Sequence, residues 1–152
     1  MYAFLDQPVI MLSRGGQMMV WAMRHWTRAV GAGRCPCGDV GPAFLKAKLM
    51  PGFPHFHMMM ALLNRHALDK LPFGDIDCPR ISDGEALLLS LIHLAGEEAS
   101  DRVAEAAALV ISPTAVPPLL MALDSLGAAL ADADLWPGLP MFDPDNVRFP
   151  NE

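Results

Sequence analysis

The chain has few charged residues and few cysteines, and each scarcity narrows what it can be. Charged residues make up 18% of its 152 residues and apolar residues 53%, the reverse of the balance in disordered chains. Three cysteines are too few, and odd in number, for a secreted disulfide scaffold, so we expect a reducing, cytoplasmic location. No apolar run approaches the roughly 18 residues of a membrane span, and no basic region of a secretory signal opens the chain.

Alternating runs rich in valine and isoleucine are missing too, which argues against paired strands. The aliphatic residues are mostly alanine, leucine and methionine, which favour helix. The sequence therefore predicts a single all-α domain over residues 1–152, an irregular or orthogonal bundle of five to six helices. Helices are expected from between Arg14 and Gln17 to Val30, and at Ala43–Met50, His55–Asp69, Ser82–Leu94, Ser100–Ile111 and Ala115–Ala133. Residues 1–13 are expected to be an irregular lead-in, and 136–152 an extended, proline-rich tail pinned by Trp136, Phe142 and Phe149.

The clearest local signal is an S-x-x-E capping box at the start of the fourth predicted helix. Ser82 can accept a hydrogen bond from the backbone amide three residues later, and Glu85 can reach back to the serine amide. The run that follows is apolar nearly all round, so we expect this helix to be central.

The three cysteines lie beside prolines in two predicted loops, residues 31–42 and 71–81. Cys35, Cys37 and Cys78 could supply three zinc ligands, with His55, His57 or His66 as the fourth. They could also serve a redox role, because Arg34 and Arg80 lie near enough in sequence to favour a thiolate. The interpretation we favour is simpler: small, half-buried side chains in proline turns.

Basic residues are concentrated in the first half of the chain. Residues 1–80 carry a net charge of +4, whereas residues 81–135 carry −8. Arg14, Trp21, Arg24 and Arg28 lie on one side of the first predicted helix, a face that could bind an anion or nucleic acid. We favour an interhelical contact, with Trp21 buried and the arginines solvated. The basic half could likewise face an anionic partner, but we favour packing of the basic half against the acidic half.

Two segments resemble a family of small, helical bacterial proteins of unknown function. The first is a helix reading Val20-Trp21-Ala22-Met23-Arg24-His25-Trp26 before a glycine-rich turn. The second is Cys78-Pro79-Arg80-Ile81-Ser82 with Glu85, a Cys-Pro-Arg segment that opens an Ala/Leu-rich helix. The resemblance covers residues 18–130 and implies a helical fold, without an activity.

No nucleophile elbow, phosphate-binding loop or H-E-x-x-H pattern occurs, and no residue set indicates a catalytic site. We therefore predict a non-catalytic helical binding protein without a cofactor. Because few polar residues remain to cover a monomer, a homodimer is expected. The alternatives are a metal- or thiol-dependent protein using Cys35, Cys37 and Cys78, with zinc as the metal, and the anion or nucleic-acid binder described above. Of these partners, nucleic acid is the least expected.

Overall fold

Six α-helices carry the fold in the computed structural model, which describes residues 4–97 and 100–138. They are α1 (Arg14–Gly31), α2 (Pro36–Lys46), α3 (Phe53–His66), α4 (Asp83–Gly96), α5 (Ser100–Ala108) and α6 (Val116–Asp132). Short 3₁₀ turns lie before α1 at Val9–Met11, between α2 and α3 at Met50–Gly52, and between α5 and α6 at Pro113–Ala115. The predicted all-α bundle is confirmed, and no strand forms within the described ranges.

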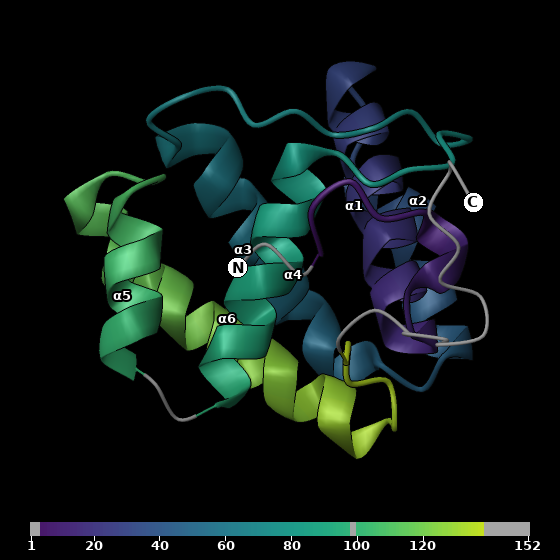
Figure 1. The fold of residues 1–152 in the computed structure, drawn as a ribbon. Helices are drawn as coiled ribbons and strands as arrows, with labels where there is room; N and C mark the ends of the chain where they lie inside the picture. Colours follow the sequence, from purple (N-terminus) through teal and green to yellow (C-terminus); the bar gives the residue numbers. More distant parts are fainter. Residues whose placement is uncertain (1–3, 98–99, 139–152) are drawn as a thin grey trace, which may run out of the picture.

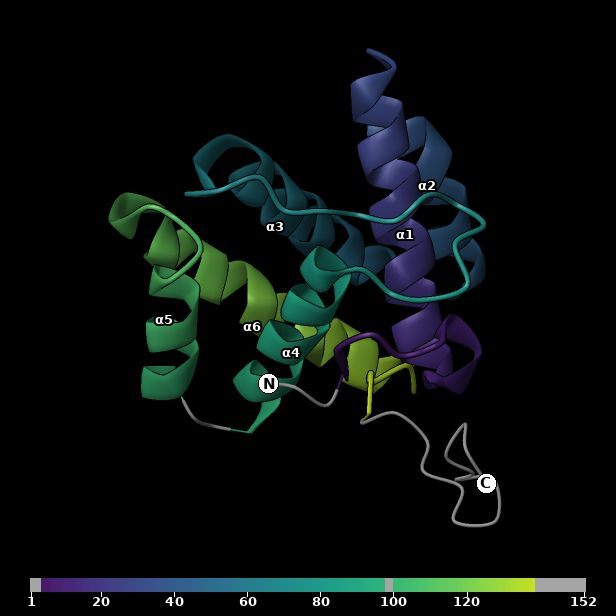
Figure 2. The ribbon, with the colours of Figure 1, turned by 45° about the horizontal axis from the view of Figure 1, so that its top comes forward.

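The helices form a bundle in which α4 and α6 are central (Figure 1). α6 packs against α3, α4 and α5, while α1 pairs with α2 on the opposite side from α5. The long connection between α3 and α4, residues 67–82, runs across α1 before it turns back to begin α4 (Figure 2). A buried arginine of α1 holds this connection in place.

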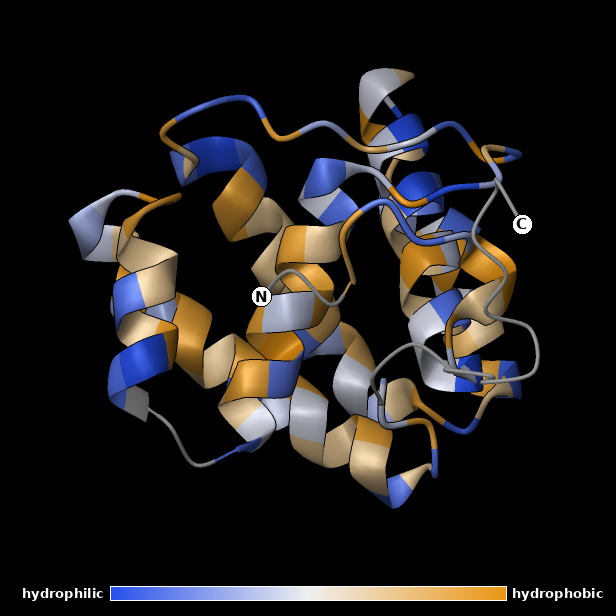
Figure 3. Ribbon diagram, viewed as in Figure 1, coloured by the Kyte–Doolittle hydropathy of each residue, from blue (hydrophilic) through white to orange (hydrophobic). Residues whose placement is uncertain are grey.

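Hydrophobic residues occupy much of each helix, whereas the long connection between α3 and α4 alternates between hydrophilic and hydrophobic residues (Figure 3). On α1, Met19, Met23 and Trp26 are buried. On α6, Leu119, Leu123, Leu126 and Leu130 have no exposed surface. These side chains belong to one continuous cluster of buried apolar residues.

The predicted position of the second helix is wrong. The sequence predicts a loop over residues 31–42 and a helix from Ala43, but α2 already begins at Pro36. Proline suits the first position of a helix, because its missing N–H would have no intrahelical partner there. Gly38 and Gly41, read as loop residues, lie inside this helix, and so does Pro42. One consequence concerns the candidate site: Cys35 is the N-cap of a helix and Cys37 lies in its first turn.

Other boundaries differ by a few residues. α3 runs from Phe53 to His66, and α5 ends at Ala108 instead of near Ile111. Beyond α5 the chain pairs with the end of α3: the amide of Leu68 donates to the carbonyl of Val110 at 2.9 Å, and that of Ser112 to His66 at 3.0 Å. These bonds compete with a further turn of either helix.

The first residue of the predicted C-terminal tail, Trp136, lies within the described residues. Trp136 packs against the core, and its ring lies over Gly96, where a Cβ atom would overlap it. The rest of the predicted tail, residues 139–152 with Phe142 and Phe149, lies outside the described residues.

Among the described residues, one stretch, Pro113–Asp132, is long and apolar enough by length and composition to cross a membrane. The same stretch supplies the buried leucines of α6, as core helices do.

Candidate functional site

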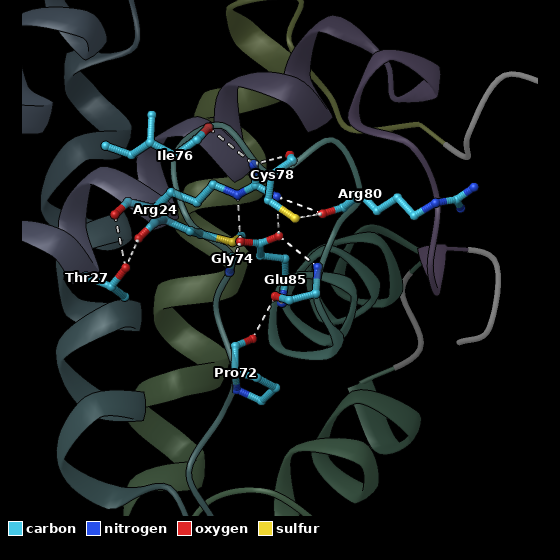
Figure 4. A network of polar contacts seen from close by, with 10 residues as sticks. Arg24, Thr27, Pro72, Gly74, Ile76, Cys78, Arg80 and Glu85 are labelled. Atoms are coloured by element: carbon cyan, nitrogen blue, oxygen red, sulfur yellow. Dashed lines mark hydrogen bonds and ion pairs between the residues drawn. The ribbon is translucent and has the colours of Figure 1, made fainter.

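A buried ion pair joins α1 to the first turn of α4 (Figure 4). The Nε atom of Arg24 lies 2.9 Å from Oε2 of Glu85, and a terminal nitrogen of the same guanidinium lies 3.0 Å from Oε1. The pair is therefore bidentate, the strongest geometry for these groups. Arg24 is 4% exposed and Glu85 has no exposed surface. Isolated charges so deep in the protein would be costly, so each requires the other.

Arg24 also holds the connection between α3 and α4. One terminal nitrogen donates to the carbonyl oxygens of Cys78 at 2.7 Å and of Ile76 at 3.4 Å. The other donates to the carbonyl of Arg80 at 2.9 Å as well as to Glu85. A guanidinium has five N–H donors, and all five have acceptors here. The hydrogen bond to Glu85 raises the pKa of Arg24, against the opposing effect of burial.

Glu85 is equally occupied. Its Oε2 atom accepts from the amide of Gly74 at 2.8 Å, and Oε1 accepts from the amide of Ser82 at 2.9 Å. The serine hydroxyl in turn accepts from the amide of Glu85 at 3.4 Å, so the predicted capping box is confirmed. Together with Arg24, these amides use the four acceptor positions of the carboxylate. No acceptor position remains for a further donor or a metal ion.

The turn before α4 is fixed by close backbone packing. The hydroxyl of Ser82 donates to the carbonyl of Pro72 at 2.7 Å, and the amide of Gly84 donates to the same oxygen at 3.0 Å. A Cβ atom at Gly84 would overlap that oxygen. The connection is therefore pinned at Pro72, at Gly74 and at the carbonyls that Arg24 binds. This set of groups is structural, because its donors and acceptors are saturated.

The structure overturns one part of the predicted basic face. Arg24 is buried, whereas the sequence suggested that it lines a solvated side of α1. Trp21 is 37% exposed, so the interpretation with a buried Trp21 and solvated arginines is wrong for both residues. Arg14 and Arg28 are exposed. An anion site on this face would have to use Arg14, Trp21 and Arg28 alone.

On that face, Trp21 and His25 form a stacked aromatic pair. The rings of Trp21 and His25 are 4.1 Å apart between centroids, at an angle of 29°. Burial lowers the pKa of His25, and the charge of Arg28 lowers it further, while Asp39 acts in the opposite direction. Asp39 itself pairs with Arg34 at 2.8 Å, which lowers the pKa of its carboxyl group. The exposed face of α1 is thus less basic than its sequence suggests.

The cysteines do not form a common site. Cys35 and Cys37 are exposed at the start of α2, so the prediction of half-buried side chains is wrong for these two. A hydrogen bond to Cys35 raises the pKa of Cys37. Cys78 is half-buried in the other connection, where its Sγ atom donates to the carbonyl of Arg80 at 3.2 Å. No group of three or more His, Cys, Asp or Glu side chains able to hold a metal occurs in the described part of the chain. A metal site built from all three cysteines is therefore not formed.

The histidines considered as a fourth ligand have other surroundings. Trp26 donates its indole N–H to Nδ1 of His57 at 3.1 Å, which uses one ring nitrogen. Phe53 stacks on the same imidazole, with ring centroids 6.4 Å apart. His55 and His66 are half-buried on α3. The sequence gives a reason to expect that a buried indole N–H finds an acceptor, but not that His57 is the acceptor.

Two cavities have Trp26 in their lining. The loop-side cavity, about 460 Å³, lies between α1, α3 and the start of the 67–82 connection, with Leu63, Leu71 and Phe73 in its lining. The α2-side cavity, about 390 Å³, includes Val30, His57 and Leu62. Trp26 and Asn64 line both. Sequence analysis missed this arrangement, because Trp26 reads as an ordinary core residue.

Comparisons with protein-family models, with curated proteins and with solved structures find no match for this chain. The resemblance to the small helical bacterial family stays a prediction. Two regions of the fold bear on function: the saturated Arg24–Glu85 network and the cavities at Trp26.

Proposed function

We propose that this protein is a non-catalytic helical binding protein whose binding site is the pair of cavities that Trp26 lines. One observation carries the proposal: cavities of about 460 Å³ and 390 Å³ share Trp26 and Asn64 in their linings. Both volumes lie in the range of small-molecule sites, roughly 300–1,000 Å³. The lining combines apolar side chains with a few polar ones, as such sites do.

The main polar network supports a binding role instead of a catalytic one. General acid–base chemistry needs a group that can give or take a proton within reach of a substrate. Arg24 and Glu85 are the most deeply buried charged residues described, and their donors and acceptors are used by the 67–82 connection. The hydrogen-bonding groups of both side chains hold the backbone of that connection.

The indole N–H signals of the three tryptophans test the proposal by ¹H–¹⁵N NMR. Trp21→Phe and Trp136→Phe assign two of the three signals by removal and leave that of Trp26. The neutral probe 2-naphthylmethanol, added to about 1 mM, should shift the Trp26 signal and leave the other two in place. If the Trp26 signal stays unmoved, the cavities are not a binding site and the proposal fails.

Two variants locate the binding. Ala61 lines the α2-side cavity and Ala67 lines the loop-side cavity, and both are partly exposed, so a larger side chain can be placed at either position. Ala61→Phe and Ala67→Phe should each weaken the probe response by filling one cavity. A response that survives both substitutions would place the probe elsewhere.

A homodimer is our second proposal, supported by large apolar side chains on the surface. Ile10, Leu109 and Met121 are 79%, 72% and 73% exposed. Sedimentation velocity at micromolar concentration should show a dimer that Met121→Lys or Leu109→Lys weakens. A monomer of the unmodified chain would end this proposal and leave the cavity proposal intact.

A further inference from the structure

We propose that the α2-side cavity selects a small carboxylate with an apolar body. The inference rests on the proposed binding role of the two cavities and adds the class of ligand. It comes from a difference between them in charge and in available donors.

The charged side chains of the two cavities differ. The α2-side cavity is lined by Arg65, His57 and His66, and by no aspartate or glutamate among the described residues. The loop-side cavity is lined by one acid and one base, Asp69 and Lys70. An anion therefore meets a favourable charge in the first cavity and a balanced pair in the second.

Arg65 is the main source of that charge. It is exposed in the last turn of α3, where a cation is favoured by the negative end of the helix dipole. The ion pairs among the described residues involve other side chains, so no described carboxylate occupies Arg65. A guanidinium binds a carboxylate through two parallel hydrogen bonds. The guanidinium of Arg65 is thus available for such a pair beside an apolar cavity.

His57 supplies a second donor. Its Nδ1 atom accepts from the indole of Trp26 at 3.1 Å. A neutral imidazole that accepts at Nδ1 carries its proton on Nε2, so it can donate there. The hydrogen bond fixes this tautomer, and Phe53 stacks on the ring. The imidazole is thereby held as an N–H donor in the cavity lining.

The remaining lining is suited to an apolar group. Val30, Ala61 and Leu62 are half-buried, and Trp26 belongs to the same lining. A volume of about 390 Å³ is sufficient for a fused two-ring body. The expected ligand therefore joins such a body to one carboxylate.

Calorimetric titration with two probes of the same shape tests this inference. 2-Naphthoate carries the carboxylate, and 2-naphthylmethanol replaces it with a neutral hydroxymethyl group. We expect naphthoate to bind about tenfold more tightly, the effect of one charge-assisted contact. Arg65→Gln should reduce that ratio to about threefold or less. Equal affinities in the unmodified protein would overturn the carboxylate preference and leave the proposed function standing.

Matched variants separate a local contact from general charge. Lys70→Gln removes the same unit of charge from an exposed residue at the other cavity, and it should leave the ratio unchanged. Ala61→Phe should abolish naphthoate binding, whereas Ala67→Phe should not. If Lys70→Gln lowers the ratio as much as Arg65→Gln, or if Ala67→Phe alone blocks naphthoate, the assignment to this cavity is wrong. Absence of binding by both probes at about 1 mM would overturn this inference together with the proposed function.

Discussion

Arg24 and Glu85, 61 residues apart in the chain, form a bidentate ion pair that also serves as the anchor of the 67–82 connection. The pair differs from an ordinary buried salt bridge, because most of its hydrogen bonds go to backbone groups. The carbonyls of Ile76, Cys78 and Arg80 and the amides of Gly74 and Ser82 depend on it. Replacing both charges with apolar side chains would leave these groups, except the Arg80 carbonyl that also accepts from Cys78 Sγ, without partners.

Arg24→Lys keeps the charge but should destabilise the fold strongly. A lysine ammonium has three donors and no planar fork, so it cannot serve Glu85 and three carbonyls together. We expect a loss of about 2–4 kcal/mol in the free energy of unfolding, measured in urea. Arg28→Lys, on the same helix but exposed, is the control and should change stability by less than about 0.5 kcal/mol. Equal effects of the two substitutions would show that the fork is not needed.

Gly84→Ala should destabilise the protein although alanine is the better helix former. The added Cβ would overlap the carbonyl oxygen of Pro72 and push the connection away from α4. We expect a loss of about 1–3 kcal/mol. Gly38→Ala in α2 is the matched control, since nothing lies within 4 Å of its Cβ position, and it should stabilise by about 0.5–1 kcal/mol. If both substitutions stabilise, the contact at Pro72 is looser than described.

His25 should titrate below the usual pKa of histidine. Burial and the charge of Arg28 lower its pKa, so Arg28→Gln should raise it and Asp39→Asn should lower it further. The folded protein then binds fewer protons than the unfolded chain just below pH 6.5, the usual value, so stability falls as the pH drops through that window. ¹H NMR titration measures the pKa, and urea unfolding at several pH values should show a shallower loss for His25→Gln. A pKa of His25 that ignores Arg28→Gln would contradict the stated cause.

The two exposed thiols of α2 should influence each other. A hydrogen bond to Cys35 raises the pKa of Cys37, so Cys35→Ala should lower it and increase the thiolate fraction at neutral pH. In a Cys78→Ser background, alkylation by iodoacetamide followed by fragmentation mass spectrometry distinguishes modification of Cys37 from that of Cys35. The pH at which the alkylation rate of Cys37 is half-maximal should move down. An unchanged pH profile would mean that the two thiols do not interact in solution.

Sequence patterns were reliable where a helix carries its own signals. The helix predicted from between Arg14 and Gln17 to Val30 matches α1, and the Ser82–Glu85 box predicted the start of α4. α2 was misplaced because Pro36, Gly38 and Pro42 resemble a loop when read one at a time. A proline at the first helical position and glycines facing open space cost a helix little, and the sequence alone does not show which side of a helix is open.

The candidate site was less predictable, because its residues meet only through the fold. Glu85 was recognised as a local cap, but its partner Arg24 belongs to another helix and was assigned to the surface. Helical periodicity places Trp21, Arg24 and Arg28 on one side of α1, and only the path of residues 67–82 buries the middle one. The cavities at Trp26 depend in the same way on helix packing. His57 accepts the indole N–H because the packing of α1 and α3 brings it next to Trp26.

The two roles of Glu85 have a consequence for local opening of the structure. The carboxylate that caps α4 also binds the amide of Gly74, so the first turn of the helix cannot fray without releasing the connection. Segments that open together show the same free energy in native-state hydrogen exchange. The amides of Gly74 and Ser82 should therefore exchange through one shared opening, although eight residues of chain separate them. Helix start and crossing segment then behave as a single cooperative unit.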